Sequence, residues 1–212
     1  MNKKVFLVIL FFISGMLFAQ NTSTQVTHIM DKTLQKYNAL SAFSLDFTVN
    51  IDENAKTIKN FKGVLFVKKD KYFVIFEEQV IANDGKMIWN YQKSANEVSF
   101  FEVEEDDLMF NPQKILNNWA QEYAAKFIRE EELQKKQTFI VDLTPKKRSP
   151  FYKIRLFVDK ETFYIQQIMM YEMDGSTITY AITKFTPNAV ISDAKFTFNK
   201  NDYPNVQIND MR

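Results

Sequence analysis

Hydrophobic residues follow two different periods along the chain, and the first is that of a helix. Between residues 22 and 40 the apolar side chains are spaced three or four positions apart, at Val26, Ile29, Met30, Leu34 and Tyr37. That spacing places them on one side of an α-helix, with the polar residues on the other side. The segment therefore predicts one long amphipathic helix near the N-terminus.

From residue 43 the period becomes two, which is that of a strand with one buried face. Apolar and polar residues alternate over 43–51. Further apolar runs, separated by polar corners, predict strands at 58–67, 72–76, 79–82, 87–91, 98–103, 125–130, 139–144, 152–158, 163–171 and 177–186, and the apolar segment 206–208 closes the chain. The Asp84-Gly85 and Asp174-Gly175 pairs indicate tight hairpin turns, because Asp-Gly tolerates a positive φ.

The middle of the chain interrupts this series of strands. An acidic run over 102–107 is expected to be a solvated loop, since it has no spacing typical of metal ligands. Asn111-Pro112 then predicts the start of a short helix that ends near Trp119, because Asn caps a helix and Pro fits its first position. Ile115 and Leu116 lie on the apolar side of that helix.

These elements predict one domain of the mainly β (α+β) class. We expect a single antiparallel meander of about eleven strands with an N-terminal helix and short inserted helices. A sheet of that length curls and encloses space. Helices that cover its apolar concave face would form a lid over a hydrophobic cavity. The alternative, that the same side chains form an ordinary packed core, stays open at the level of periodicity.

Residues 1–19 have the composition of an export signal. Lys3-Lys4 precedes an unbroken apolar run, Val5 to Phe12, and small and apolar residues lead to Ala19-Gln20. This order is typical of a secretory signal peptide, and the run is short for a hydrocarbon core of ~30 Å. We therefore expect a signal peptide at 1–19, cleavage near Ala19-Gln20 and a mature periplasmic domain, 20–212, that is soluble after cleavage.

The composition excludes several classes of function. The chain has 27 Lys and Arg, 26 Asp and Glu, a formal net charge of +1, no Cys, one His and four Gly. Balanced charge argues against nucleic-acid binding. The lack of Cys excludes disulfides, thiolate metal sites and a lipidated N-terminal cysteine. No glycine-rich phosphate loop is present, so we expect neither a cofactor nor a metal.

An enzyme is not expected either. Asp46, Glu77 and Glu172 occupy positions where charge is normal on a strand surface, and nothing in the sequence pairs them for glycoside hydrolysis. The single histidine, His28, lies off the apolar stripe of the first helix and has no partners for nucleophilic catalysis.

Three motifs occur in a fixed order along the mature chain: Asp84-Gly85-Lys86-x-x-Trp89-x-Tyr91, Asn111-Pro112, and Asp193-Ala194-Lys195-Phe196-Thr197-Phe198. With the export signal and the first helix, this set resembles the LolA family of periplasmic carriers of outer-membrane lipoproteins. The acidic run before Asn111 and the Tyr203-Pro204 ending are most similar to members from the Bacteroidetes.

The resemblance implies an incomplete β-barrel with a helical lid over a cavity for acyl chains. By position, the residues lining that cavity would come from the sheet, the hairpin and the lid helix: Phe73, Ile75, Ile81, Trp89, Ile115 and Leu116. The implied partners are outer-membrane lipoproteins, an inner-membrane lipoprotein-releasing ABC transporter and an outer-membrane acceptor. The implied activity is transfer of lipoproteins from the inner to the outer membrane.

One position departs from the family. Where the family has an arginine that holds the lid shut, the matching stretch reads Leu65-Phe66-Val67-Lys68-Lys69, which places Lys69 at the latch position. Lysine lacks the planar fork of arginine, so the latch is expected to be weaker or built differently. A general carrier of hydrophobic ligands, an acceptor of the same fold, an envelope sensor domain and a hydrolase remain the competing interpretations.

Overall fold

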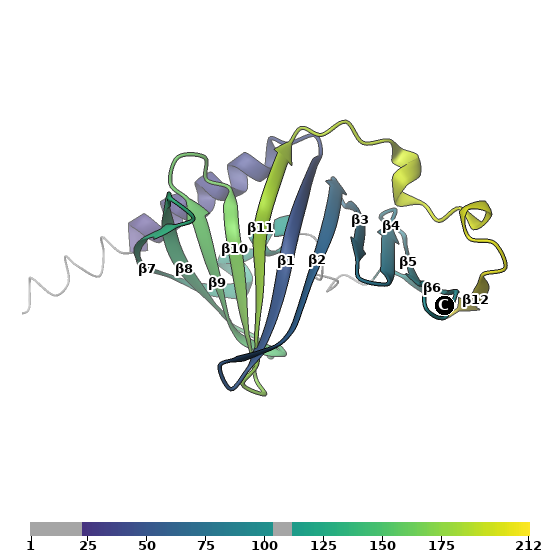
Figure 1. Ribbon diagram of the computed structural model, residues 1–212. Coiled ribbons are helices and arrows are strands. Elements are labelled where there is room, and N and C mark those ends of the chain that lie inside the picture. The colour runs from purple at the N-terminus through teal and green to yellow at the C-terminus, as the bar shows by residue number, and fades with distance from the viewer. Residues whose placement is uncertain (1–22, 104–111) are drawn as a thin grey trace, which may run out of the picture.

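The computed structural model describes residues 23–103 and 112–212 (Figure 1). The predicted signal peptide, most of the acidic run and Asn111 lie outside these residues. Among the described residues, twelve strands form a single sheet. Their bounds are β1 Phe43–Glu53, β2 Lys56–Lys68, β3 Lys71–Phe76, β4 Gln79–Asn83, β5 Met87–Gln92, β6 Glu97–Glu102, β7 Tyr123–Leu133, β8 Lys136–Pro145, β9 Phe151–Asp159, β10 Ile165–Glu172, β11 Thr177–Pro187 and β12 Gln207–Asp210.

The sheet is open, and its strand order is β12-β6-β5-β4-β3-β2-β1-β11-β10-β9-β8-β7. Strands β1–β6 and β7–β11 are two meanders, which join where β1 pairs antiparallel with β11. Strand β12 then returns to pair in parallel with β6. Because β12 and β7 remain unjoined edges, the sheet is an incomplete barrel, which confirms the predicted fold class.

The N-terminal helix covers residues 23–38 and lies across the part of the sheet that contains β7–β11 (Figure 1). Its buried positions, Val26, Ile29, Met30, Thr33 and Tyr37, follow the predicted stripe. The helix ends where Ala39 N–H and Leu40 N–H donate to the carbonyls of Gln35 and Tyr37. No helix among the described residues is long and apolar enough to cross a membrane.

The inserted helical segment is divided in two. Helix α2 spans Pro112–Asn117 and α3 spans Trp119–Glu122, after which the chain enters β7 directly. Leu116 is fully buried and Ile115 nearly so, as the apolar side of the predicted helix requires. Two short 3-10 helices, η1 Asp193–Phe196 and η2 Lys200–Asp202, precede β12.

Two turns show how side chains set the strand ends. The predicted Asp84-Gly85 turn is present: Gly85 has φ +93°, and Asp84 Oδ1 accepts from Lys86 N–H and Met87 N–H at 2.8 and 2.9 Å. In contrast, the strand predicted from Phe163 begins only at Ile165. Asp159 Oδ1 accepts from the backbone of Glu161 and Thr162, both at 2.9 Å, and this turn places Phe163 at φ +60°.

Candidate functional site

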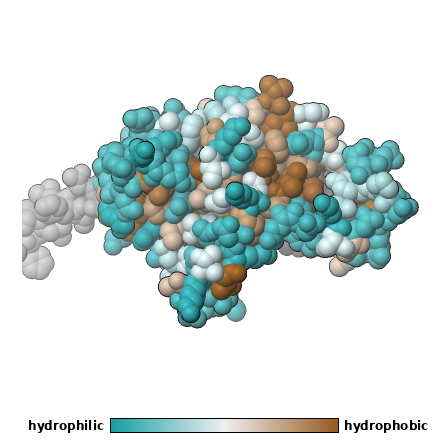
Figure 2. Space-filling model, viewed as in Figure 1, coloured by the Kyte–Doolittle hydropathy of each residue, from teal (hydrophilic) through white to brown (hydrophobic). Residues whose placement is uncertain are grey.

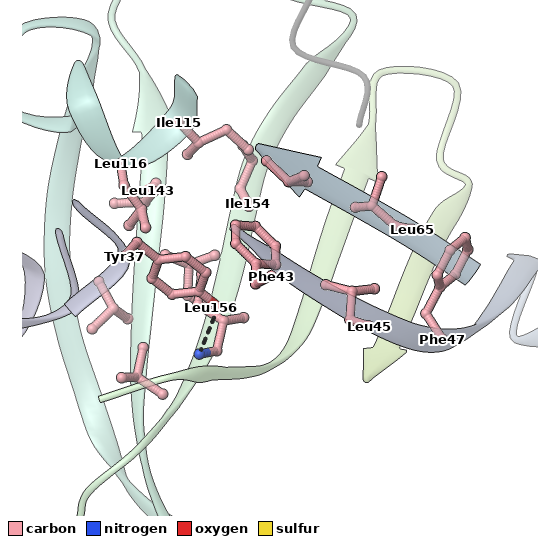
Figure 3. Close-up of a cluster of buried hydrophobic side chains, with 14 of the residues drawn as sticks. Tyr37, Phe43, Leu45, Phe47, Leu65, Ile115, Leu116, Leu143, Ile154 and Leu156 are labelled. Carbon is pink, nitrogen blue, oxygen red and sulfur yellow. Dashed lines mark hydrogen bonds between the residues drawn. The ribbon is translucent and has the colours of Figure 1, made fainter. Parts of the chain in front are cut away.

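One face of the sheet carries the helices and the buried core, and we call it the inner face. Residues directly opposite each other in neighbouring antiparallel strands project to the same face. Leu45 and Leu65 are such partners. Both belong to the buried cluster that also contains Tyr37 of the N-terminal helix and Leu116 of α2. Figure 3 shows these side chains converging from strands and helices on one interior.

Tyr37 anchors the end of the N-terminal helix to this interior. Its ring meets Phe43, Tyr164 and Phe185 edge-on, with centroids 5.6, 5.7 and 5.9 Å away. Its hydroxyl oxygen accepts a hydrogen bond of 3.3 Å from Ile165 N–H. Desolvation by burial raises the pKa of the Tyr37 hydroxyl well above its usual value. The phenol is therefore a neutral packing element under ordinary conditions.

The centre of the inner face is filled by side chains. Leu116, Leu143, Ile154 and Leu156 are all fully buried, and they lie between the helices and strands β8 and β9 (Figure 3). A ligand can enter this part only when the helices move away from the sheet.

Beyond the helices the inner face carries further apolar side chains, and these are partly accessible. We call the accessible residues of β2, β3, β5 and β6 the open strip: Phe61, Phe76, Ile88 and Phe101. Ladder pairing places all four on the inner face, since Phe61 lies opposite Val49, Phe76 opposite Gly63 and Phe101 opposite Ile88. The rings of Phe61 and Phe76 stack with their centroids 5.6 Å apart.

The six predicted cavity residues are divided between the two faces. Ile81 lies on the inner face opposite Val74, and both belong to the buried cluster, as do Ile115 and Leu116. The other three, Phe73, Ile75 and Trp89, project to the outer face, because they alternate with inner-face positions in β3 and β5. The predicted set therefore does not line one cavity, and the binding role of its inner members stays a prediction.

The inner-face residues that the sequence pattern did not identify occupy the alternate positions of the same strands. In β3, Tyr72 and Val74 are buried on the inner face and Phe76 is partly buried there. Every residue from Tyr72 to Phe76 is aromatic or aliphatic, so hydrophobicity alone does not identify the inner side.

The outer-face aromatics are covered by the C-terminal segment. Phe196 of η1 is fully buried, and Lys195 Nζ lies 4.8 Å from the ring centroid of Phe73. Asp193 pairs with Lys68 at 3.2 Å and with Lys71 at 3.5 Å. The hydrogen bond and charge of Lys68, followed by the charge of Lys71, lower the pKa of the Asp193 carboxyl.

A second aromatic group attaches the end of this segment to β5 and β6. Phe198 lies 5.8 Å from Phe100 and 4.9 Å from Tyr203, measured between ring centroids. Tyr203 lies 4.3 Å from Tyr91, and Phe100 meets Trp89 at 6.2 Å. Trp89 thus belongs to the packing under the C-terminal segment.

A polar contact from α2 joins the inserted helical segment to the N-terminal helix. Gln113 Nε2 donates to the carbonyl oxygen of Tyr37 at 3.1 Å. Lys69, the predicted latch, occupies the exposed turn between β2 and β3 with φ +55°. Its neighbour Lys68 donates to the carbonyl of Ile191 at 3.3 Å. The role of Lys69 as a latch remains a prediction.

Two of the three carboxylates considered for hydrolysis, Glu77 and Glu172, have other partners. Glu77 pairs with Lys59 at 3.0 Å, and Glu172 accepts from Ser176 Oγ at 2.6 Å. In the described part of the chain no three His, Cys, Asp or Glu side chains are placed to hold a metal ion. The large apolar side chains that remain exposed include Ile75, Phe101 and Val190, and hydrophobic patches interrupt a largely hydrophilic surface (Figure 2).

A family model described only as an uncharacterized protein matches residues 67–190, from the end of β2 through β11. The chain belongs to that family. A curated relative, an uncharacterized protein of Methanocaldococcus jannaschii, is 29% identical to this chain over 204 residues. The alignment covers 93% of this chain and 58% of the relative. The chain thus spans somewhat more than half the length of that relative.

A solved structure shares the fold at low sequence identity. An uncharacterized conserved protein from Thermus thermophilus aligns with a TM-score of 0.60 and 10% identity, over 88% of this chain and 99% of that one. A putative outer membrane lipoprotein-sorting protein domain from Vibrio parahaemolyticus aligns with a TM-score of 0.49 and 11% identity, over 85% and 98%. A LolA superfamily protein from Nitrosomonas europaea aligns with a TM-score of 0.45 and 13% identity, over 82% and 97%.

Proposed function

We propose that this protein binds the acyl chains of lipids or lipid-modified proteins on the inner face of its sheet and carries them through an aqueous compartment. The observation that carries the proposal is the open strip, in which Phe61, Phe76, Ile88 and Phe101 continue the apolar core beyond the helices. An apolar surface that continues into a core covered by helices suits a flexible hydrocarbon chain.

The energetics of acyl chains call for such a protein. Removing one methylene from water is favourable by about 0.8 kcal/mol of free energy. Exposing one long acyl chain to water therefore costs on the order of 10 kcal/mol. A free lipid-modified protein therefore does not cross water at a useful rate. Phenylalanine is a suitable wall for the chain because it offers a large apolar area with no polar group to satisfy.

The lid is the element that would admit and release the chain. Ile115 and Leu116 of α2 fill part of the inner face, and Gln113 ties the same helix to the N-terminal helix. Displacement of α2 would uncover the fully buried centre and join it to the open strip. Breaking that hydrogen bond costs about 1 kcal/mol net, and the larger cost of exposing Ile115 and Leu116 would be offset when an acyl chain takes their place on the inner face.

The more specific part of the proposal, the transport of lipoproteins between two membranes, rests on the sequence. The N-terminal signal and the ordered motifs that resemble the LolA family support a periplasmic carrier of outer-membrane lipoproteins. That carrier would receive its cargo from an inner-membrane ABC transporter and pass it to an outer-membrane acceptor. We expect binding without chemical change of the cargo, so the protein would not be an enzyme.

The direct experiment compares two synthetic peptides of one sequence, with and without an N-terminal lipid modification. Both are titrated into protein purified without detergent, and binding is followed by calorimetry. The lipidated peptide should bind and the unmodified peptide should not. Equal binding of the two would contradict the proposal. A free fatty acid that competes with the lipidated peptide would show that the acyl chain is the recognised part.

A further inference from the structure

Asn90 is a polar residue on the inner face, beside the open strip. It lies in β5, opposite Ile81 of β4 and Ser99 of β6. Because opposite residues share a face, the Asn90 side chain projects to the same side as Ile81, which belongs to the buried cluster. Ile88 of the open strip is two residues away on the same strand and projects to the same side.

The carboxamide oxygen of Asn90 is buried and has no hydrogen-bond partner. A buried acceptor without a partner is costly, and most such atoms in folded proteins are satisfied by protein groups or water. Among the described residues, the other side-chain atom of this kind is Thr33 Oγ1. Thr33 is fully buried on the N-terminal helix, whereas Asn90 is only partly buried and borders the open strip. Of the two, Asn90 is the one that lies beside the open strip.

We propose that Asn90 Oδ1 accepts a hydrogen bond from a donor at the polar end of the bound acyl chain. We call this polar end, which includes the carbonyl group and the atom attached to it, the root of the chain. The inference rests on the proposed function and deepens it, because it specifies the ligand chemistry. The chain would lie along the open strip, and its root would displace the side chains that bury the Asn90 oxygen. Ligands whose root carries an N–H or O–H, such as N-acyl amides, would then be preferred over esters of the same chain. An ester root carries only acceptors and leaves the Asn90 oxygen unpaired.

The test uses palmitamide and methyl palmitate, which have the same acyl chain and differ in the donor at its root. Each is titrated against the full mature protein in competition with a fluorescent fatty acid. The native protein should bind the amide about five- to tenfold more tightly, which is the range for one net hydrogen bond. Asn90→Leu should reduce that ratio to near one by weakening amide binding, while ester binding stays close to that of the native protein.

Two further variants keep the test decisive. Asn90→Asp keeps an acceptor at the same place and should retain the preference for the amide. Ser99→Ala removes the only hydroxyl directly opposite Asn90 and should leave the ratio unchanged.

The possible outcomes separate the two proposals. If neither probe binds the native protein, the proposed function fails. If both bind equally, or the Asn90→Leu protein keeps the preference, acyl binding stands and the role of Asn90 is refuted. A preference for the ester would also refute it, because the carboxamide would then present its N–H group to the ligand.

Discussion

The side chain of Gln113 in α2 donates a hydrogen bond of 3.1 Å to the carbonyl oxygen of Tyr37, in the last turn of the N-terminal helix. Carbonyls in the last turn of a helix lack the usual partners within the helix, and this one also accepts from Leu40 N–H. The contact joins the two helical elements that cover the inner face. The packing of Ile115 and Leu116 and this hydrogen bond thus hold α2 on the inner face.

Replacing that side chain should loosen the lid. We expect Gln113→Leu to accelerate both uptake and release of a fluorescent fatty acid, because the open state becomes easier to reach. The free energy of unfolding should fall by only about 0.5–1.5 kcal/mol. Stopped-flow fluorescence measures the rates. Gln121→Leu in α3, at an exposed position, is the matched control, and equal rates for the two variants would show that the contact does not restrain the lid.

Gly63 should be intolerant of any side chain. A Cβ at this position would lie 2.3 Å from Phe47 Cζ and 2.8 Å from the carbonyl oxygen of Ile75. We expect Gly63→Ala to lower the free energy of unfolding by about 1–3 kcal/mol, the usual range for overpacking, as measured by urea denaturation.

The same clash predicts coupling between Gly63 and Phe47. In a double-mutant cycle, Phe47→Leu should recover part of the loss caused by Gly63→Ala, because it removes the closest contact. Additive effects would show that the backbone contact with Ile75, and not Phe47, limits the space.

Tyr37 should make the protein sensitive to alkali. Burial raises the pKa of its hydroxyl in the folded state, so the folded state holds its proton more tightly than the unfolded state. The contribution of this hydroxyl to the free energy of unfolding is fully present below about pH 10, the pKa of a tyrosine in the unfolded chain. It is lost as the pH rises above that value, by at most about 1.4 kcal/mol per pH unit.

Urea midpoints measured from pH 8 upward test this dependence. We expect the midpoint to fall above about pH 10 in the native protein. In Tyr37→Phe that fall should be smaller, although the variant starts from lower stability because Ile165 N–H loses its acceptor. Tyr152→Phe, at an exposed position, should keep the native slope. Parallel profiles for the native protein and Tyr37→Phe would contradict the assignment.

The sequence predicts the elements of this fold better than their orientation. The stripe from Val26 to Tyr37 identifies both the helix and its buried side, because polar residues occupy the rest of that segment. The alternation over 43–51 likewise identifies the inner face of β1, where Phe43, Leu45, Phe47 and Val49 are all buried. In both places one side is polar, and so the pattern itself points to the interior.

The candidate site could not be placed in the same way. Strand β3 is apolar on both sides, because the C-terminal segment covers its outer side with η1. That long-range packing leaves no local signal, so Phe73 and Ile75 could be taken for cavity residues while Tyr72 and Val74 were missed. The position of the lid contact was also beyond the sequence, since Gln113 and Tyr37 are 76 residues apart and meet only in the folded chain.

The most direct measurement compares two glutamate variants with the lipidated peptide as ligand. Phe101 on the inner face is 37% exposed and Ile75 on the outer face is 41% exposed, so a charge at either position has a similar cost for folding. If the inner face binds the acyl chain, Phe101→Glu weakens binding by at least about tenfold, the loss that follows when apolar contact is replaced by a charge, whereas Ile75→Glu binds as the native protein does. Native affinity in Phe101→Glu, or an equal loss in both variants, would contradict the account.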